Sequence, residues 1–388
     1  MHHKKIKTKL RNIMKFTISS GALCSRLQTL NRVLNSKNSL QILSCILFDL
    51  KKDKLILTAS DGDVYLRTEL PVNDCEDTGK FALNAQQIIN GLKEISEQPV
   101  EIVVNDSTYN VEIKYQNGRG EFVGQNGKEY PAPQAMEKEG TSSLSVSSEI
   151  LVNGLTHTLF ATADDELRPV MNGVYFDLQP VGLTFVASDG HKLVRDRNVS
   201  VTTDVPTAFI LPKKPAKILK EVLSKEMDDV TIKFNDTQAQ VKVDSYELSC
   251  RLIEGRYPNY NSVIPTDNPY KITIDRQALL GALRRVIVFA STTTSLIKIE
   301  AKQGQLVISS QDVDFSTSAK ESIPCDYDGT DIRIGFKGQF LIEMLSSISS
   351  DEIILELADP SRAGVITPAE QNENEDMLTL LMPMMLND

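Results

Sequence analysis

Hydrophobic and polar positions follow the same order three times along the chain. Residues 16–27 alternate as Phe16-x-Ile18 and then place Leu23 and Leu27 four residues apart. This pattern predicts a short strand that leads into an amphipathic helix. It returns with an offset of 128 residues, twice, at these positions: Leu144, Val146, Leu151 and Leu155; then Ile272, Ile274, Leu279 and Leu283. A fixed period of this length indicates an internally repeated unit.

Other blocks keep the same order. Ser60-Asp61-Gly62, after an apolar strand, returns as Ser188-Asp189-Gly190, and 309–312 is a degenerate third copy. Asn105-Asp106-Ser107 and Asn235-Asp236-Thr237 are hairpin turns between alternating strands. A second helix is predicted in each unit after an alternating strand, over 85–96, 213–224 and 339–348. Four block types in register exclude coincidence.

The predicted fold class is α+β, with three similar domains that each contain two helices and antiparallel sheets. Polar stretches that contain Gly or Pro place the boundaries near 138 and 266. We therefore expect a leader or tag remnant (1–13) and three domains, 14–138, 139–266 and 267–388. The residues alone allow two arrangements: an arc that closes head-to-tail into a ring, or a linear three-domain scaffold.

Composition indicates a globular protein that is acidic overall but has a basic leader. Hydrophobic residues make up 41% of the chain, and no apolar run reaches the ~18 residues of a membrane span. The five scattered cysteines form no C-x-x-C pair, which fits a reducing cytoplasm. Removing the leader, which holds five Lys or Arg and no acid, changes the net charge from −10 to about −15. Met14 is the more natural start, and any DNA surface on so acidic a chain must be local.

Positive charge concentrates on the predicted helices. Candidates to face DNA phosphates are these residues: Arg32, Lys37, Lys213, Lys214, Lys217, Arg284 and Arg285. A charge run on one helix is commonly just a solvated face, but the repetition over three units favours a phosphate-facing surface. Aromatic residues do not interleave with these cations, so base stacking and base readout are not indicated. Sequence-independent attraction to duplex DNA remains.

Motifs for catalysis are absent from the sequence. There is no phosphate-binding G-x-x-x-x-G-K-[ST], no H-E-x-x-H and no G-x-S-x-G. Ser188, Asp189 and His191 are adjacent in sequence, whereas triad partners converge in space. His191 replaces Asp63 of the first copy, and three roles stay open for it: a catalytic group, part of a partner surface, or a structural histidine. His157, on a predicted helix face, is expected in packing or at the surface.

The C-terminal segment 377–386 is rich in Leu and Met. Its first half reads as the last strand of the third domain, and Met382-Pro383-Met384 reads as a flexible apolar end. These methionines either belong to the core or form a surface that adapts to partners.

Three motifs together resemble the bacterial DNA polymerase III beta subunit family of sliding clamps. They are Val186 to Leu193 (VASDGHKL), Leu252 to Tyr260 (LIEGRYPNY) and Met382-Pro383-Met384, and the opening Met14 to Ile18 agrees. The similarity covers about residues 14–386. It implies a homodimeric ring of six domains around double-stranded DNA, with helices at the hole, and a processivity role for the replicative polymerase. Val288 and Phe289 match an apolar pair in the family's dimer interface.

The resemblance also implies a partner-peptide cleft between the second and third domains. The family's partners there are the replicative polymerase alpha subunit, the clamp loader, other polymerases and repair proteins. The matching positions are these residues: Met171, Ser188, Gly190, His191, Lys192, Leu193, Pro258, Val263, Leu381, Met382, Pro383 and Met384. An apolar trough with a few polar groups suits a short peptide with apolar anchors. The resemblance implies no catalytic residue, metal or cofactor, and a cytoplasmic protein without a membrane anchor.

Some positions depart from the family pattern. Ser262 and Met385 stand where family members often carry Arg, and Pro169-Val170 replace a tyrosine pair that contacts DNA in some members. These departures concern peptide preference and the DNA contacts of loop 164–171. Two rival functions are a hydrolase that uses His191 and Asp189, and a repeat scaffold that binds no DNA.

Overall fold

The computed structural model describes residues 13–35, 40–137, 140–223 and 229–386. The chain divides into two compact units, which are described one at a time. Residues 1–145 and 221–251 form the first unit, and residues 146–220 and 252–388 form the second. The middle third of the chain thus contributes to both units.

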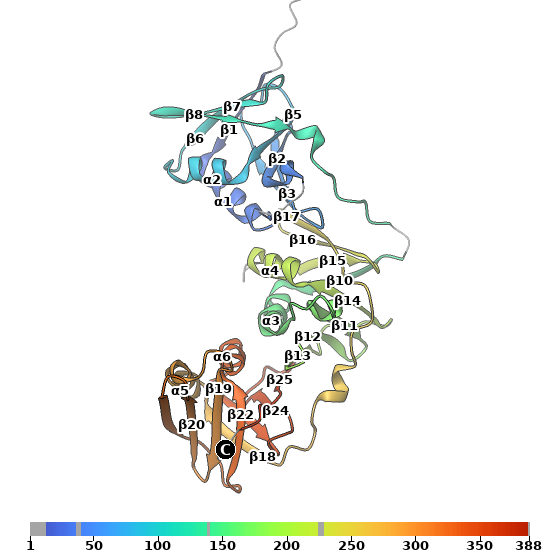
Figure 1. The fold of residues 1–388 in the computed structure, drawn as a ribbon. Helices are drawn as coiled ribbons and strands as arrows, with labels where there is room; N and C mark the ends of the chain where they lie inside the picture. The colour runs from blue at the N-terminus through green and yellow to red at the C-terminus, as the bar shows by residue number, and fades with distance from the viewer. Residues whose placement is uncertain (1–12, 36–39, 138–139, 224–228, 387–388) are drawn as a thin grey trace, which may run out of the picture. The chain divides into compact units, whose positions relative to one another are not determined.

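The first unit contains a four-stranded sheet of order β1-β6-β7-β8 and a nine-stranded sheet of order β10-β15-β16-β17-β4-β3-β2-β5-β9 (Figure 1). Its strands are β1 (Ile13–Ser19), β2 (Cys45–Leu50), β3 (Lys54–Ser60), β4 (Val64–Pro71), β5 (Gly79–Asn84), β6 (Pro99–Asn105), β7 (Asn110–Tyr115), β8 (Gly118–Val123), β9 (Gln125–Asn126), β15 (Asp229–Phe234), β16 (Gln238–Val243) and β17 (Tyr246–Arg251), with β10 (Ser142–Ser147) running on into the second unit. Its helices are α1 (Ser20–Asn31), α2 (Ala85–Lys93) and the 3-10 turns η1 (Gln41–Ser44) and η2 (Gly127–Glu129). Helix α4 (Lys213–Val222) crosses from the second unit into the first.

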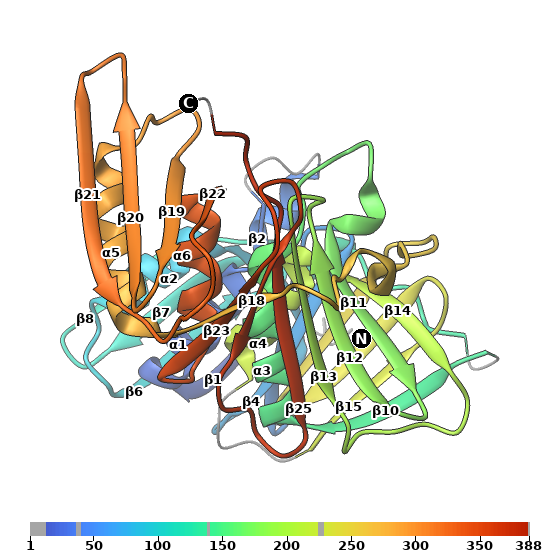
Figure 2. The same cartoon turned by 90° about the horizontal axis from the view of Figure 1, so that it is seen from below.

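The second unit contains an eight-stranded sheet of order β14-β11-β12-β13-β25-β24-β23-β18 and a four-stranded sheet of order β21-β20-β19-β22 (Figure 2). Its strands are β11 (Gly173–Gln179), β12 (Gly182–Ser188), β13 (Lys192–Asn198), β14 (Thr207–Pro212), β18 (Tyr270–Asp275), β19 (Leu296–Lys302), β20 (Gln305–Asp312), β21 (Thr317–Pro324), β22 (Ile332–Lys337), β23 (Glu352–Leu357), β24 (Gly364–Pro368) and β25 (Glu375–Leu381). Its helices are α3 (Ser148–Thr158), α5 (Arg276–Val286), α6 (Gly338–Ser347) and the 3-10 turns η3 (Leu159–Ala161), η4 (Pro169–Met171), η5 (Tyr260–Val263) and η6 (Ile287–Phe289).

The sequence repeat is a structural repeat. All twelve apolar positions of the repeated pattern are buried, as predicted. The repeat extends to the helix caps, because Ser19, Ser147 and Asp275, again 128 residues apart, accept a hydrogen bond from the backbone N–H three residues on. Such caps satisfy backbone donors that the first helical turn leaves without a partner. Both predicted helices are present in each repeat. The second helix of each repeat (α2, α4 and α6) ends one to three residues earlier than expected.

The repeated Ser-Asp-Gly blocks are tight turns with the same hydrogen bonds. The Ser60 hydroxyl accepts from Gly62 N, and the Asp61 carboxylate accepts from the N–H groups of residues 63 and 64. Ser188 and Asp189 do the same for residues 190, 191 and 192. Both glycines have positive φ, +105° and +90°, which only Gly adopts without strain. The repeat of the motif therefore reflects turn chemistry.

Sheets run on from one predicted domain into the next. Strand β17 pairs with β4 in the first unit, and β13 pairs with β25 in the second. Sequence periodicity does not reveal these pairings. The domain boundaries near 138 and 266 stay predictions. Residues 138 and 139, at the first boundary, lie outside the described ranges.

Candidate partner-binding site and DNA surface

The hairpin between β12 and β13 carries most of the predicted peptide-binding residues. The Ser188 hydroxyl donates to Lys192 O at 2.8 Å, and Asp189 Oδ1 accepts from the N–H groups of His191 and Lys192. Asp189 Oδ2 lies 3.3 Å from Lys192 Nζ. Both side chains are thus used to build the turn. In the described chain, neither Ser188 nor Asp189 forms a hydrogen bond or ion pair with the His191 ring, so a Ser-His-Asp relay is not assembled there.

Strand β25 brings the C-terminal residues beside this hairpin. Lys192 is opposite Leu381 and Leu193 is opposite Leu380 in the antiparallel register. Met382 N donates to His191 O at 2.8 Å, and Met384 N donates to Gly335 O at 2.8 Å. The expectation of a flexible end was therefore wrong for Met382 to Met384, because the backbone is held on both sides. The prediction that the first half forms the last strand is confirmed by β25.

The Leu252 to Tyr260 motif lies against the same region. Tyr257 stacks on Tyr175 with centroids 4.6 Å apart, and the Tyr260 hydroxyl donates to Asp177 at 2.8 Å. Burial raises the pKa of Tyr260, and the bond to Asp177 adds to the rise. Buried Leu193, Leu380, Tyr257 and Tyr260 belong to one hydrophobic cluster. Pro258 and Val263, which lie before and after Tyr260 in the sequence, are exposed.

The predicted peptide-binding residues differ in how far they are exposed to solvent. Met382 and His191 are exposed, Pro383 and Met384 are half-buried, and Leu381 and Leu193 are buried. Met171 is buried at the end of η4, and its neighbour Val170 packs against the hydrophobic cluster. Gly190 is exposed, and a Cβ there would lie 2.7 Å from Arg168 Nη1.

Lys192 does not present its ammonium group to solvent. Its side chain is only 6% exposed, and Nζ lies 3.3 Å from Glu343 Oε2 on α6 and 3.8 Å from the centre of the Phe340 ring. A buried ammonium group requires such partners. Glu343 and Phe340 therefore support the hairpin from the third repeat. Neither residue could be recognised from the sequence, because both lie about 150 residues away and belong to no motif.

His157 was expected either in packing or at the surface, and the structure places it in packing. Its Nδ1 lies 2.7 Å from Asp196 Oδ2, and both side chains are nearly buried. The pair joins α3 to β13.

The predicted DNA-facing cations lie on or beside helices, and several have carboxylate partners. Arg32, at the C-cap of α1, pairs with Glu221 of α4. Lys213 lies 2.6 Å from Asp164, and Arg285 pairs with Glu321, whose pKa the guanidinium lowers. These partners reduce the positive field that each cation presents.

The remaining DNA-facing candidates differ in their exposure to solvent. Lys217 and Arg284 are exposed on α4 and α5, Lys214 is half-buried, and Lys37 lies outside the described residues.

The predicted dimer-interface pair is on the surface. Val288 is 76% exposed and Phe289 is 41% exposed in η6, directly after α5. Large apolar side chains so exposed on a short turn are typical of a contact surface.

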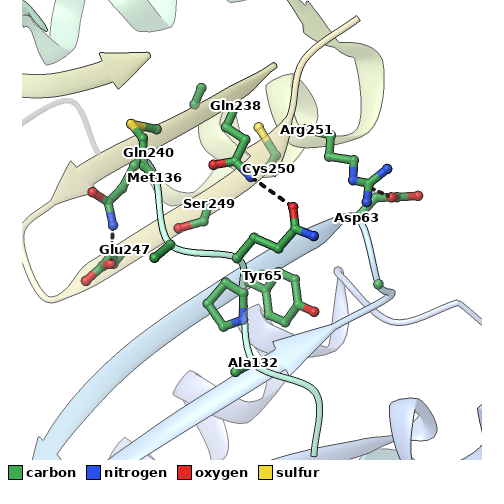
Figure 3. Close-up of a pocket in the computed structure, with 15 residues that line it drawn as sticks. Asp63, Tyr65, Ala132, Met136, Gln238, Gln240, Glu247, Ser249, Cys250 and Arg251 are labelled. Atoms are coloured by element: carbon green, nitrogen blue, oxygen red, sulfur yellow. Dashed lines mark hydrogen bonds and ion pairs between the residues drawn. The ribbon is translucent and has the colours of Figure 1, made fainter. Parts of the chain in front are cut away.

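A polar pocket of about 480 Å³ in the first unit contains none of the predicted site residues (Figure 3). It is lined by β4, β16, β17 and segment 132–136. Its charged and amide groups face one another: Arg251 lies 3.5 Å from Asp63, and the Gln240 amide donates to Glu247 at 2.6 Å. Among the described residues, no group of three or more His, Cys, Asp or Glu could hold a metal ion.

Known proteins agree with this fold over nearly the whole chain. Three protein-family models match the chain in order. They describe the DNA polymerase III beta subunit N-terminal domain (14–134), central domain (145–259) and C-terminal domain (261–385). The Beta sliding clamp of Synechococcus elongatus is 27% identical over 366 residues, which cover 92% of this chain and 96% of that protein. The Beta sliding clamp of Staphylococcus aureus is 25% identical, covering 96% of this chain and 99% of the relative.

Solved structures have the same fold. The sliding clamp of Pseudomonas aeruginosa bound to griselimycin superposes with a TM-score of 0.88 at 23% identity, covering 96% of this chain and all of that chain (100%). The DNA polymerase sliding clamp of Bacillus subtilis gives 0.88 at 24% identity, with coverage of 96% and 100%. In the described part of the chain, no helix is long and apolar enough to cross a membrane. The chain belongs to the DNA polymerase III beta subunit family, and its function is that of a DNA sliding clamp that gives the replicative polymerase its processivity.

Proposed function

We propose that two copies of this chain close head-to-tail into a ring around duplex DNA. The ring then keeps the polymerase near the primer end by raising its effective concentration there. Tight binding to DNA is not required, and weak contacts to phosphates allow the ring to slide. In this mechanism the chain needs no catalytic residue, metal or cofactor. It would act in the cytoplasm, where bacterial DNA is replicated.

The observation that carries the ring is a pair of open sheet edges. Strand β8 ends the four-stranded sheet of the first unit, and β21 ends the four-stranded sheet of the second. The opposite edges of these sheets are covered, because β1 exchanges hydrogen bonds with Asn73 and β22 accepts one from Met384. An uncovered edge is a template for pairing with another chain.

Antiparallel pairing of β8 with β21 of a second copy brings apolar residues together. Phe289 O lies 3.5 Å from the Thr317 hydroxyl, so Phe289 is near the start of β21. Phe122 and Val123 are at the end of β8. Only antiparallel strands place the end of β8 beside the start of β21. This orientation puts Phe122 and Val123 next to Val288 and Phe289.

The cations on the helices support the DNA part of the proposal. Lys217 and Arg284 are exposed, and the helices that carry them belong to the second and third repeats. Their attraction to phosphates would be independent of sequence. The acidic remainder of the chain would repel DNA from other faces.

The surface formed by the β12–β13 hairpin, Pro258, Val263 and Met382 to Met384 is the proposed docking site for partner peptides. From the resemblance we expect the polymerase alpha subunit, other polymerases, the clamp loader and repair proteins to bind there. Apolar groups above a rigid core, with backbone polar groups at the edge, suit a short peptide with Leu or Phe anchors.

Two experiments test these parts. Class averages from negative-stain electron microscopy should show closed rings with a central hole, whereas open arcs or compact particles at micromolar concentration would contradict the ring. For the docking site, Met382→Ala should weaken binding of a C-terminal peptide from the polymerase of the same organism by about tenfold. Met385→Ala, a change at the more exposed methionine next in the segment, is the matched control.

A further inference from the structure

The turn between β20 and β21 exposes two large apolar side chains. Val313 and Phe315 are each 77% exposed. The turn is rigidly built, since Asp312 Oδ1 accepts hydrogen bonds from the N–H groups of residues 314 and 315, and Ser316 has a φ of +53°. Asp312 itself is buried. Figure 2 shows the end of the β20–β21 hairpin projecting from the sheet. The exposure of Val313 and Phe315 in this turn is unfavourable unless something covers them.

The first unit has a hollow whose lining is partly apolar. It measures about 450 Å³ and is formed by β1, β6, β7 and β8. Its lining includes the apolar residues Ile13, Val103 and Val123 and the charged residues Glu112, Arg119 and Glu121. Val123 is 79% exposed. The register places Ile13 opposite Asn105, and Asn110 opposite Val123, so that these residues form one row across the end of the sheet.

The hollow and the tip lie at matching ends of the two open edges. Val123 is the last residue of β8, and the tip directly precedes Thr317, the first residue of β21. When β8 and β21 of two copies pair antiparallel, the end of β8 meets the start of β21. The tip of one copy then lies beside Val123 of the other, which is one of the residues that line the hollow.

We propose that the β20–β21 tip is an anchor of the interface between two copies, with Phe315 and Val313 seated in the hollow beside Val123. This inference rests on the proposed ring and adds a contact outside the Val288–Phe289 pair. A second copy is the occupant because the tip continues the open edge of β21 and Thr317 contacts Phe289. Aromatic side chains buried in pockets supply a large share of interface energy.

The first test measures the dimer dissociation constant by sedimentation velocity at several concentrations. The double variant Val313→Ser and Phe315→Ser should raise it by roughly tenfold or more. Val205→Ser, which removes another exposed valine (72%) from a loop of the second unit, is the matched control and should leave it unchanged. Far-UV circular dichroism and thermal unfolding confirm that each variant is folded.

The outcomes separate this inference from the ring itself. If the tip variant dissociates like the wild type while Phe289→Ser dissociates more readily, the tip is not an anchor and the ring stands. If the wild type is monomeric at micromolar concentration, the ring fails and the anchor with it.

A second test does not depend on loss of affinity. Val123→Cys combined with Phe315→Cys should give a covalent dimer on mild oxidation, since a disulfide requires Cα atoms within about 7 Å. Each single variant reports on the natural cysteines and should remain uncrosslinked. A dimer that forms normally but gives no crosslink in the double variant would overturn the placement of the tip.

Discussion

Lys192 Nζ and Glu343 Oε2 lie 3.3 Å apart, with the lysine side chain almost fully buried. The contact joins the hairpin of the second repeat to α6 of the third. Since Lys192 also pairs through its backbone with Leu381, the same residue fixes the C-terminal segment of the proposed docking site. A buried charge that loses its partner costs far more than an exposed one.

Glu343→Gln should therefore lower the free energy of unfolding by about 1–3 kcal/mol, because Lys192 keeps only Asp189 as a charged partner. The matched control is Glu69→Gln, which alters the exposed Lys54–Glu69 pair at 2.8 Å. Its effect should stay below about 1 kcal/mol. Urea denaturation measures both, and equal effects would show that the Lys192 contact is no stronger than a surface pair.

Gly154 in α3 should not tolerate a methyl group. A Cβ there would lie 2.4 Å from a ring carbon of Phe185, which is buried. Gly154→Ala should destabilise the protein by about 1–3 kcal/mol through overpacking, although Ala is the better helix former. Gly281→Ala in α5 is the control, because its Cβ meets only the flexible end of Arg285. It should be neutral or stabilising in thermal unfolding; the reverse order would refute the packing argument.

Stability should fall at alkaline pH. Burial raises the pKa of the Cys250 thiol from 9.0 to about 12, and burial raises that of Tyr175 from 10.0 to about 12. Both groups ionise more readily in the unfolded chain, so unfolding releases protons between pH 9 and 12 and the free energy of unfolding decreases there. Below pH 9 the thiol is protonated in both states and contributes no slope.

Cys250→Ala tests the thiol contribution. It should flatten the decline in stability between pH 9 and 10.5, as measured by urea denaturation. Cys75→Ala, at a half-buried cysteine, should leave most of the decline in place. An unchanged slope in Cys250→Ala would contradict the assignment.

Charge reversal on the helices should weaken DNA contacts. Lys217→Glu with Arg284→Glu should reduce processive synthesis and make it less sensitive to salt, because fewer phosphates are neutralised. Lys242→Glu with Lys302→Glu makes the same net change at exposed positions on strands β16 and β19. If both pairs of changes act equally, net charge and not the helix surface determines the effect.

The sequence predicted what depends on local spacing. Phe16, Leu151 and Leu283 are buried where the periodicity puts them, and the Ser-Asp-Gly turns form in both copies. Some of the candidate partner-binding residues, which were assigned through the family resemblance, lie on neighbouring strands. The β13–β25 register places Lys192 opposite Leu381. Whether they bind a peptide stays a prediction.

Long-range partners could not be predicted from the sequence. Arg32 pairs with Glu221, 189 residues away, while its role in facing DNA stays a prediction. Met384 was expected in a flexible end, yet it bonds to Gly335. The open edges of β8 and β21 depend on which strands remain without a neighbour, and a repeat pattern carries no such information. Two apolar residues in a polar turn, Val313 and Phe315, were the one available signal for the tip.

The central claim is that the protein is linked topologically to DNA. It is tested most directly by loading labelled protein onto nicked circular DNA with the clamp loader of the same organism and ATP, followed by gel filtration. The account predicts that the protein co-elutes with circular DNA and is released when a restriction enzyme linearises it. Protein that stays bound to linear DNA, or never co-elutes with the circle, would contradict the ring.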